Sequence, residues 1–158
     1  MSKPLRHVEA PAARNAALPV DDYLELSALG RSQWIRERRA PRPTFDVRTP
    51  HSTFVELERS AAGELLPTLT VLLRSRECPW HCLMCDLWKS TVSHPIPPGA
   101  IPAQIGAALT RQVASPFGRV RQVKLYNSGS FFDAGAVPPS DYAEIVRRLS
   151  GFERVIVE

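Results

Sequence analysis

The amino-acid sequence predicts an α/β fold built on a parallel sheet with helices on one side. Three apolar segments have the character of strands, at residues 66–73, 120–126 and 154–158. Two segments with helical periodicity lie between them, one beginning near Pro102 and one near Ser140. Strands that alternate with helices form a parallel sheet through right-handed crossovers.

The first part of the chain is predicted to be a tail followed by a helical region. Residues 1–19 contain three prolines and show no hydrophobic periodicity, so we expect a flexible tail. Residues 21–39 place apolar side chains at roughly helical spacing, interrupted at Gly30. This pattern predicts one broken helix or two short ones.

A linker and an edge strand are predicted to follow. Prolines at positions 41, 43 and 50 remove backbone donors from residues 40–50, which indicates a linker. Residues 54–58 alternate between apolar and charged side chains, and residues 60–63 supply a turn. We therefore assign residues 20–63 to a helical N-terminal extension that ends in an edge strand.

Each element of the predicted sheet has its own pattern. Residues 66–73 are almost continuously apolar, as in a parallel strand that is covered on both faces. Apolar residues recur every four positions from Ile101, which predicts a helix to about Ala114. Ser140 is expected to cap the second helix and Gly151 to end it. The last strand stops at the final residue, so the sheet looks unfinished and we expect a truncated chain.

Composition indicates a folded protein. The chain has 158 residues, and 44% of them are hydrophobic, enough for one domain with a core. No segment approaches the roughly 20 apolar residues of a membrane span, and no signal peptide is evident, so we expect a soluble cytoplasmic protein. The net charge of +4 is compatible with an RNA partner. Because no arginine-rich face with interleaved aromatics is evident, nucleic-acid binding is the weaker interpretation.

Three cysteines form the strongest motif. Cys78, Cys82 and Cys85 have the spacing C-x3-C-x2-C, which suits a shared metal site better than disulfides. Soft thiolates bind the iron of iron-sulfur clusters, and three ligands leave one iron open to a further ligand. The motif follows an apolar strand directly, so it should lie at the carboxyl edge of the sheet, where ligand sites collect.

This cysteine motif resembles the signature of the radical S-adenosylmethionine (radical SAM) superfamily. The resemblance implies a partial (βα)6 barrel, of which residues 64–158 would be the N-terminal half with three parallel strands and two crossover helices. It implies that the cysteines hold a 4Fe-4S cluster, which takes an electron from an external donor. S-adenosylmethionine bound at the open iron is then cleaved to a 5′-deoxyadenosyl radical. The family commonly has an aromatic residue against the adenine where this chain has Met84.

A second segment, residues 124–133, is similar to the second-strand region of the elongator catalytic subunit and of the archaeosine-synthase radical subunit. This resemblance implies contacts to the methionyl end of the cofactor from Asn127, Ser128, Gly129 and Ser130. A loop of small polar residues at a strand end also offers hydroxyls and carbonyls to an ammonium group. By the same analogy, a tRNA nucleoside is the suggested substrate.

Two alternatives stay open. One is a zinc-stapled binding module without catalysis, in which His81 or an acidic residue is the fourth ligand. The other is an inactive half-barrel that needs a missing C-terminal segment or a second chain to complete it.

Other residues receive weaker interpretations. Trp80 could shield a cluster, whereas Trp88 is assigned to packing. Glu158 could meet the cofactor's amine or ribose, while Lys124 and Asp133 have no defined role. The histidines at positions 7, 51 and 94 receive no role, because they have no ligand partners at useful spacing.

Overall fold

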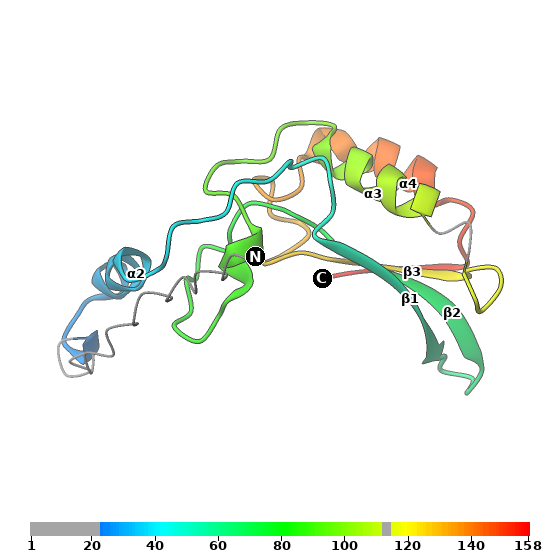
Figure 1. Cartoon of the computed structure of the whole chain (residues 1–158), viewed down its shortest axis with the longest axis horizontal. Coiled ribbons are helices and arrows are strands. Elements are labelled where there is room, and N and C mark those ends of the chain that lie inside the picture. Colours follow the sequence, from blue (N-terminus) through cyan, green and yellow to red (C-terminus); the bar gives the residue numbers. More distant parts are fainter. Residues whose placement is uncertain (1–22, 112–114) are drawn as a thin grey trace, which may run out of the picture.

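The computed structural model describes residues 23–111 and 115–158, so the predicted tail at 1–19 and the predicted helix end at Ala114 lie outside the described residues. The elements follow the expected order of strands and helices (Figure 1). They are α2 (Ala28–Glu37), β1 (Ser52–Arg59), β2 (Leu65–Leu72), a 3-10 turn η1 (Leu87–Ser90), α3 (Ala100–Arg111), β3 (Gln122–Tyr126), a 3-10 turn η3 (Pro139–Asp141), α4 (Tyr142–Leu149) and β4 (Arg154–Val157).

The four strands form one sheet in the order β1-β2-β3-β4. β1 pairs with β2 in antiparallel fashion, while β2, β3 and β4 are parallel to one another. α3 and α4 both cover the same face of this sheet (Figure 1). The α/β class, the three parallel strands and the edge strand are therefore confirmed, and the edge strand proves to be antiparallel to its neighbour.

The core lies between this face of the sheet and the two helices. Alternate residues of the strands point toward the helices, as the two-residue period of a strand requires. The side chains that fill the space are almost fully buried. They include Leu69, Val71, Val123 and Leu125 from the strands, Ile101 and Ile105 from α3, and Ile145 and Leu149 from α4.

The opposite face of the sheet is polar at its centre, although β2 was predicted from an almost continuously apolar run. Thr68 and Thr70 of β2 are buried there, and the Thr70 hydroxyl donates to a carboxylate oxygen of Glu56 at 3.2 Å. Lys124 of β3 forms an ion pair with Glu58 of β1. β2 is thus covered on both faces, but the second cover consists of polar side chains from its neighbours.

The predicted interruption at Gly30 and the predicted helix cap at Ser140 were both wrong. α2 begins after Ser27, whose hydroxyl accepts the Gly30 N–H at 3.2 Å, so Gly30 lies inside the helix. Ser140 does not cap α4, because it lies within η3 and Asp141 occupies the capping position. Instead of capping its own helix, the buried Asp141 carboxylate accepts the Gly99 N–H at 2.8 and 3.0 Å.

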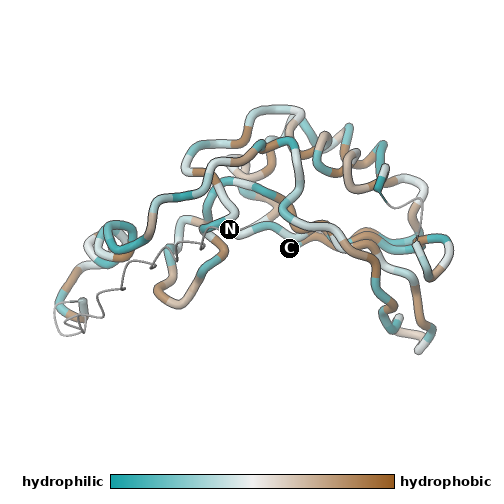
Figure 2. Tube along the Cα trace, in the orientation of Figure 1, coloured by the Kyte–Doolittle hydropathy of each residue, from teal (hydrophilic) through white to brown (hydrophobic). Residues whose placement is uncertain are grey.

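The carboxyl ends of the three parallel strands point toward the segment that contains the cysteines and η1 (Figure 1). The end of the chain, after β4, lies at this same edge. α2 lies beyond the cysteine segment and is largely hydrophilic, and the hydrophobic stretches concentrate along the central strands (Figure 2). Among the described residues, no helix combines the length and apolar character needed to cross a membrane.

Candidate metal centre

The cysteine loop is anchored to the end of β2 by backbone hydrogen bonds. Val92 N–H donates to the Ser75 carbonyl at 3.0 Å, and Glu77 N–H donates to the Val92 carbonyl at 2.9 Å. Arg76 and Val92 form an isolated parallel bridge at the same place. These contacts close residues 77–92 into a loop at the carboxyl edge of the sheet.

The three cysteines line one cavity of about 70 Å³ within this loop. None of them forms a disulfide, and Cys82 is the most exposed. His81 has a φ of 48°, in the left-handed region, which turns the backbone between the first two cysteines. Cys85 N–H then donates to the Cys82 carbonyl at 3.1 Å.

The three cysteines line one cavity, but their side chains are not yet arranged as the ligands of a metal ion. No three His, Cys, Asp or Glu side chains within residues 23–111 and 115–158 are already arranged to hold a metal ion. Between Cys78 and Asp86 the loop contains neither helix nor strand, so few backbone hydrogen bonds oppose its adjustment.

The loop after β3 forms another wall of the same cavity, as the sequence predicts for strand ends that share an edge. Ser128 lines the cavity, and its hydroxyl donates to the Arg76 carbonyl at 3.4 Å. Gly129 lies against Cys78, where an added Cβ would stand 3.3 Å from the Cys78 Cβ, closer than ordinary van der Waals contact. The absence of a side chain at Gly129 therefore permits this close approach.

A second cavity, of about 240 Å³, adjoins the first at Ser128. Tyr126, Asn127 and Glu158 contribute to its walls from the ends of β3 and β4. The amide oxygen and nitrogen of Asn127 are both buried, and neither has a hydrogen-bond partner within the described residues. Buried amides without partners are uncommon, which makes Asn127 a candidate for ligand contact.

Several residues singled out in the sequence lie outside both cavities. Met84 is 88% exposed and Trp80 is 79% exposed. Ser130 is exposed, and its hydroxyl accepts the Phe132 N–H at 3.2 Å. Asp133 forms an ion pair with Arg76 at 3.6 Å, whereas Lys124 lies on the polar face of the sheet.

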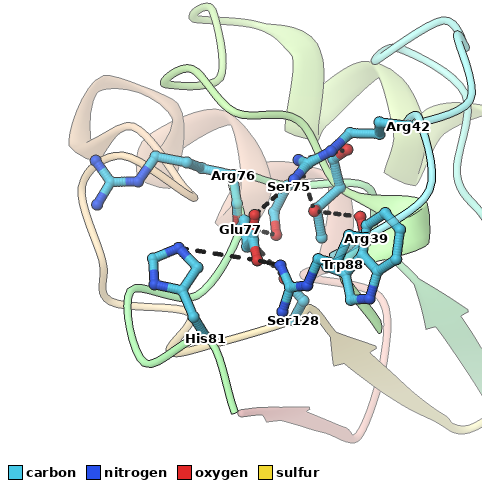
Figure 3. Close-up of polar contacts among 9 residues, drawn as sticks. Arg39, Arg42, Ser75, Arg76, Glu77, His81, Trp88 and Ser128 are labelled. Carbon is cyan, nitrogen blue, oxygen red and sulfur yellow. Dashed lines mark hydrogen bonds and ion pairs between the residues drawn. The ribbon is translucent and has the colours of Figure 1, made fainter. Parts of the chain in front are cut away.

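The sequence pattern did not point to a half-buried ionic cluster of Arg39, Arg42 and Glu77, which lies close to His81 and Trp88 (Figure 3). Glu77 forms ion pairs with Arg39 and Arg42, two residues from the segment that follows α2. His81 Nε2 also lies 3.9 Å from a Glu77 oxygen. Burial raises the pKa of Glu77, but the hydrogen bonds and charges of the two arginines outweigh it and hold that pKa below its ordinary value.

Two further residues of the site had no distinctive sequence pattern. Trp88, assigned to packing, is buried as expected, but it also lines the cysteine cavity. His51, which received no role, lines the second cavity, and its Nε2 lies 3.5 Å from the Ser90 hydroxyl. His51 directly precedes β1, and only the antiparallel pairing of that strand with β2 brings it to this edge.

Comparisons with models of known protein families, with curated proteins and with solved structures give no match to this chain.

Proposed function

We propose that this chain binds a 4Fe-4S cluster through Cys78, Cys82 and Cys85 and acts as the N-terminal part of a radical SAM enzyme. One observation carries the proposal: the three cysteines line a single cavity at the carboxyl edge of a parallel sheet, next to a second cavity that shares Ser128. A metal centre and a small-molecule site would thus lie side by side.

The donor set fits an iron-sulfur cluster. Three cysteines without a disulfide offer soft sulfur ligands of the type that holds clusters, and they leave a fourth coordination position open. The short distance between the cysteines in sequence lets one loop surround the cluster. Because Cys82 is exposed and the loop is irregular, the thiols can converge while β2 and its anchor at Val92 stay in place.

The second cavity fits the polar end of S-adenosylmethionine. That molecule carries a carboxylate, an ammonium group and ribose hydroxyls, which need both donors and acceptors. The Asn127 amide offers both, the Ser128 hydroxyl is bifunctional, and Glu158 contributes carboxylate oxygens. Met84 and Ser130 lie outside this cavity, so we assign them no contact with S-adenosylmethionine.

When bound, the cluster supplies the electron, received from an external donor, that cleaves S-adenosylmethionine to a 5′-deoxyadenosyl radical for hydrogen abstraction from a substrate. The chain's own residues bind and orient the cofactors and exclude water. Further strand-helix units, from a longer chain or a second one, would complete the barrel. A tRNA nucleoside is the suggested substrate, by analogy alone.

A zinc-stapled binding module is the second candidate, favoured by the position of His81. This histidine lines the same cavity as the three cysteines, so a Cys3His site is available without residues from elsewhere. Its Nδ1 atom is buried and has no hydrogen-bond partner within the described part of the chain.

Anaerobic reconstitution with iron and sulfide tests the first candidate against the second. We expect a brown protein with about four irons per chain, and we expect Cys82→Ala to lose the colour. The matched variant is His81→Asn, because asparagine tolerates the left-handed backbone. It should keep the cluster in an iron-sulfur protein but lose metal affinity at a zinc site. A colourless protein that binds one zinc would refute the cluster.

Binding of S-adenosylmethionine tests the second cavity. In the reconstituted protein, Asn127→Ala should weaken binding about tenfold, the effect of losing roughly one hydrogen bond to a charged group. Ser130→Ala is the matched control, because its hydroxyl is turned to the backbone of its own loop. Equal affinities of the wild type and the Asn127 variant would remove this cavity from the proposal.

A further inference from the structure

The ionic cluster at Glu77 connects the segment after α2 to the cysteine loop. Arg39 and Arg42 each bind one of the two Glu77 carboxylate oxygens. Arg42 also donates to the Thr91 carbonyl at 3.0 Å, at the far end of the same loop. Both ends of the loop are therefore held by a segment more than 30 positions earlier in the sequence.

Arg39 occupies a different position from Arg42. Arg39 lines the cysteine cavity, whereas Arg42 does not. The Arg39 side chain is only 10% exposed, and its guanidinium lies over the Trp88 ring, 4.8 Å from the ring centroid. The packing of Trp88 against this cation and the bonds to Glu77 together fix the guanidinium at the cavity wall.

The charges of the cluster do not cancel. Two guanidinium groups face one carboxylate, which leaves one net positive charge beside three cysteines. A metal group held by three cysteine sulfurs becomes more negative when it takes up an electron, and a nearby cation favours the more negative state. Because the Arg39 side chain is only 10% exposed, water and salt screen its charge less than they would screen an exposed arginine.

We propose that Arg39 is a positioning residue of the cysteine site, whose charge favours a negatively charged group held by Cys78, Cys82 and Cys85 and makes that group easier to reduce. This inference rests on the proposed function. It assigns the N-terminal segment to the metal centre and gives Arg39 a role distinct from that of Arg42. The reduction potential of an iron-sulfur cluster depends on nearby charge, so the role is measurable.

The test is a redox titration of the reconstituted protein. Arg39→Gln should lower the equilibrium constant for reduction about tenfold, equal to a shift of ~59 mV toward lower potential for a one-electron couple. Arg39→Lys keeps the charge and should restore most of the wild-type potential. Arg42→Gln removes an equal charge from a residue that does not line the cavity, so the reduction potential should shift less. Arg147→Gln, on the exposed side of α4, should cause none.

A second measurement, on the metal-free protein, separates the effect of the Arg39 charge from its effect on the order of the cysteine loop. Hydrogen exchange of residues 77–92 should become faster in both Arg39→Gln and Arg42→Gln, because each variant loses one connection to Glu77. The difference between the variants should appear only in the potential.

The outcomes distinguish the inference from the function on which it rests. A wild-type cluster whose potential is the same in Arg39→Gln, or shifts equally in Arg42→Gln, overturns the inference and leaves the proposed function intact. Failure of the wild type to take up iron and sulfide overturns both.

Discussion

Gly129 lies against Cys78 so closely that a Cβ atom added to the glycine would stand 3.3 Å from the Cβ of the cysteine. The cysteine loop after β2 and the loop after β3 meet at this contact. A methyl group here would require Cys78 or the loop after β3 to shift by a few tenths of an ångström. The missing side chain at Gly129 therefore allows the two loops to pack this closely.

We predict that Gly129→Ala destabilises the fold by about 1 kcal/mol, because Cys78 or the β3 loop must shift to relieve the overlap. Iron uptake on reconstitution should fall in the same variant. Gly151→Ala is the matched control, since an added Cβ at that position meets nothing within 4 Å. Denaturant unfolding and iron content measure the two effects. An unchanged iron content in Gly129→Ala would show that this contact does not shape the site.

A second prediction concerns the buried hydrogen bonds of Asp141. Both of its carboxylate oxygens accept the Gly99 N–H, which ties the start of α4 to the start of α3. Replacement by alanine leaves that N–H without its partner and should cost about 2 kcal/mol of unfolding free energy. Ser140→Ala should cost little, because Ser140 caps no helix. A larger loss of unfolding free energy in Ser140→Ala than in the Asp141 variant would support the serine cap that the sequence predicts.

Gln104 provides a third test, since its amide connects three segments. Its nitrogen donates to the carbonyls of Val47 and Arg74 at 2.7 and 2.8 Å, and its oxygen accepts the Arg74 N–H at 2.8 Å. Gln104→Leu would leave these buried backbone groups unsatisfied, so we expect a loss of about 3 kcal/mol. Gln33→Leu, on the exposed side of α2, is the matched control. A loss below 1 kcal/mol would mean that water replaces the amide.

The fourth prediction concerns an apolar cavity of about 390 Å³ between α4 and β4. Val146 and Phe132 border it and are 68% and 72% exposed. We expect the chain to bind the dye 1-anilinonaphthalene-8-sulfonate and to self-associate as its concentration rises. Val146→Gln should weaken both effects, whereas Leu29→Gln, on the remote α2, should not. A concentration-independent monomer in sedimentation would contradict this prediction.

The sheet was predictable because its signals are local. The apolar runs of β2, β3 and β4 and the four-residue spacing of α3 are contained in single segments, and the parallel order follows from the handedness of crossovers. The meeting of the cysteine loop with Ser128 followed from the same rule, because both segments leave parallel strands at one edge.

The ionic cluster was not predictable because it depends on distant pairs. Arg39 belongs to a sequence in which arginine is frequent, and nothing in its neighbourhood points to Glu77. The prediction of the α4 cap was wrong for a related reason. Ser140 and Asp141 are adjacent and both suit a helix start, and only the position of Gly99 from another element decides between them.

The bond between Arg39 and Glu77 spans 38 positions and encloses the whole β1–β2 hairpin. Closing a chain of this length costs about 3 kcal/mol of entropy, whereas the hairpin itself forms from neighbouring residues. We therefore expect the hairpin to form first during folding and the arginine contacts to form late and open early. Brief opening of this contact would widen the access of iron to Cys78 and Cys85, which are half-buried, while the sheet stays intact.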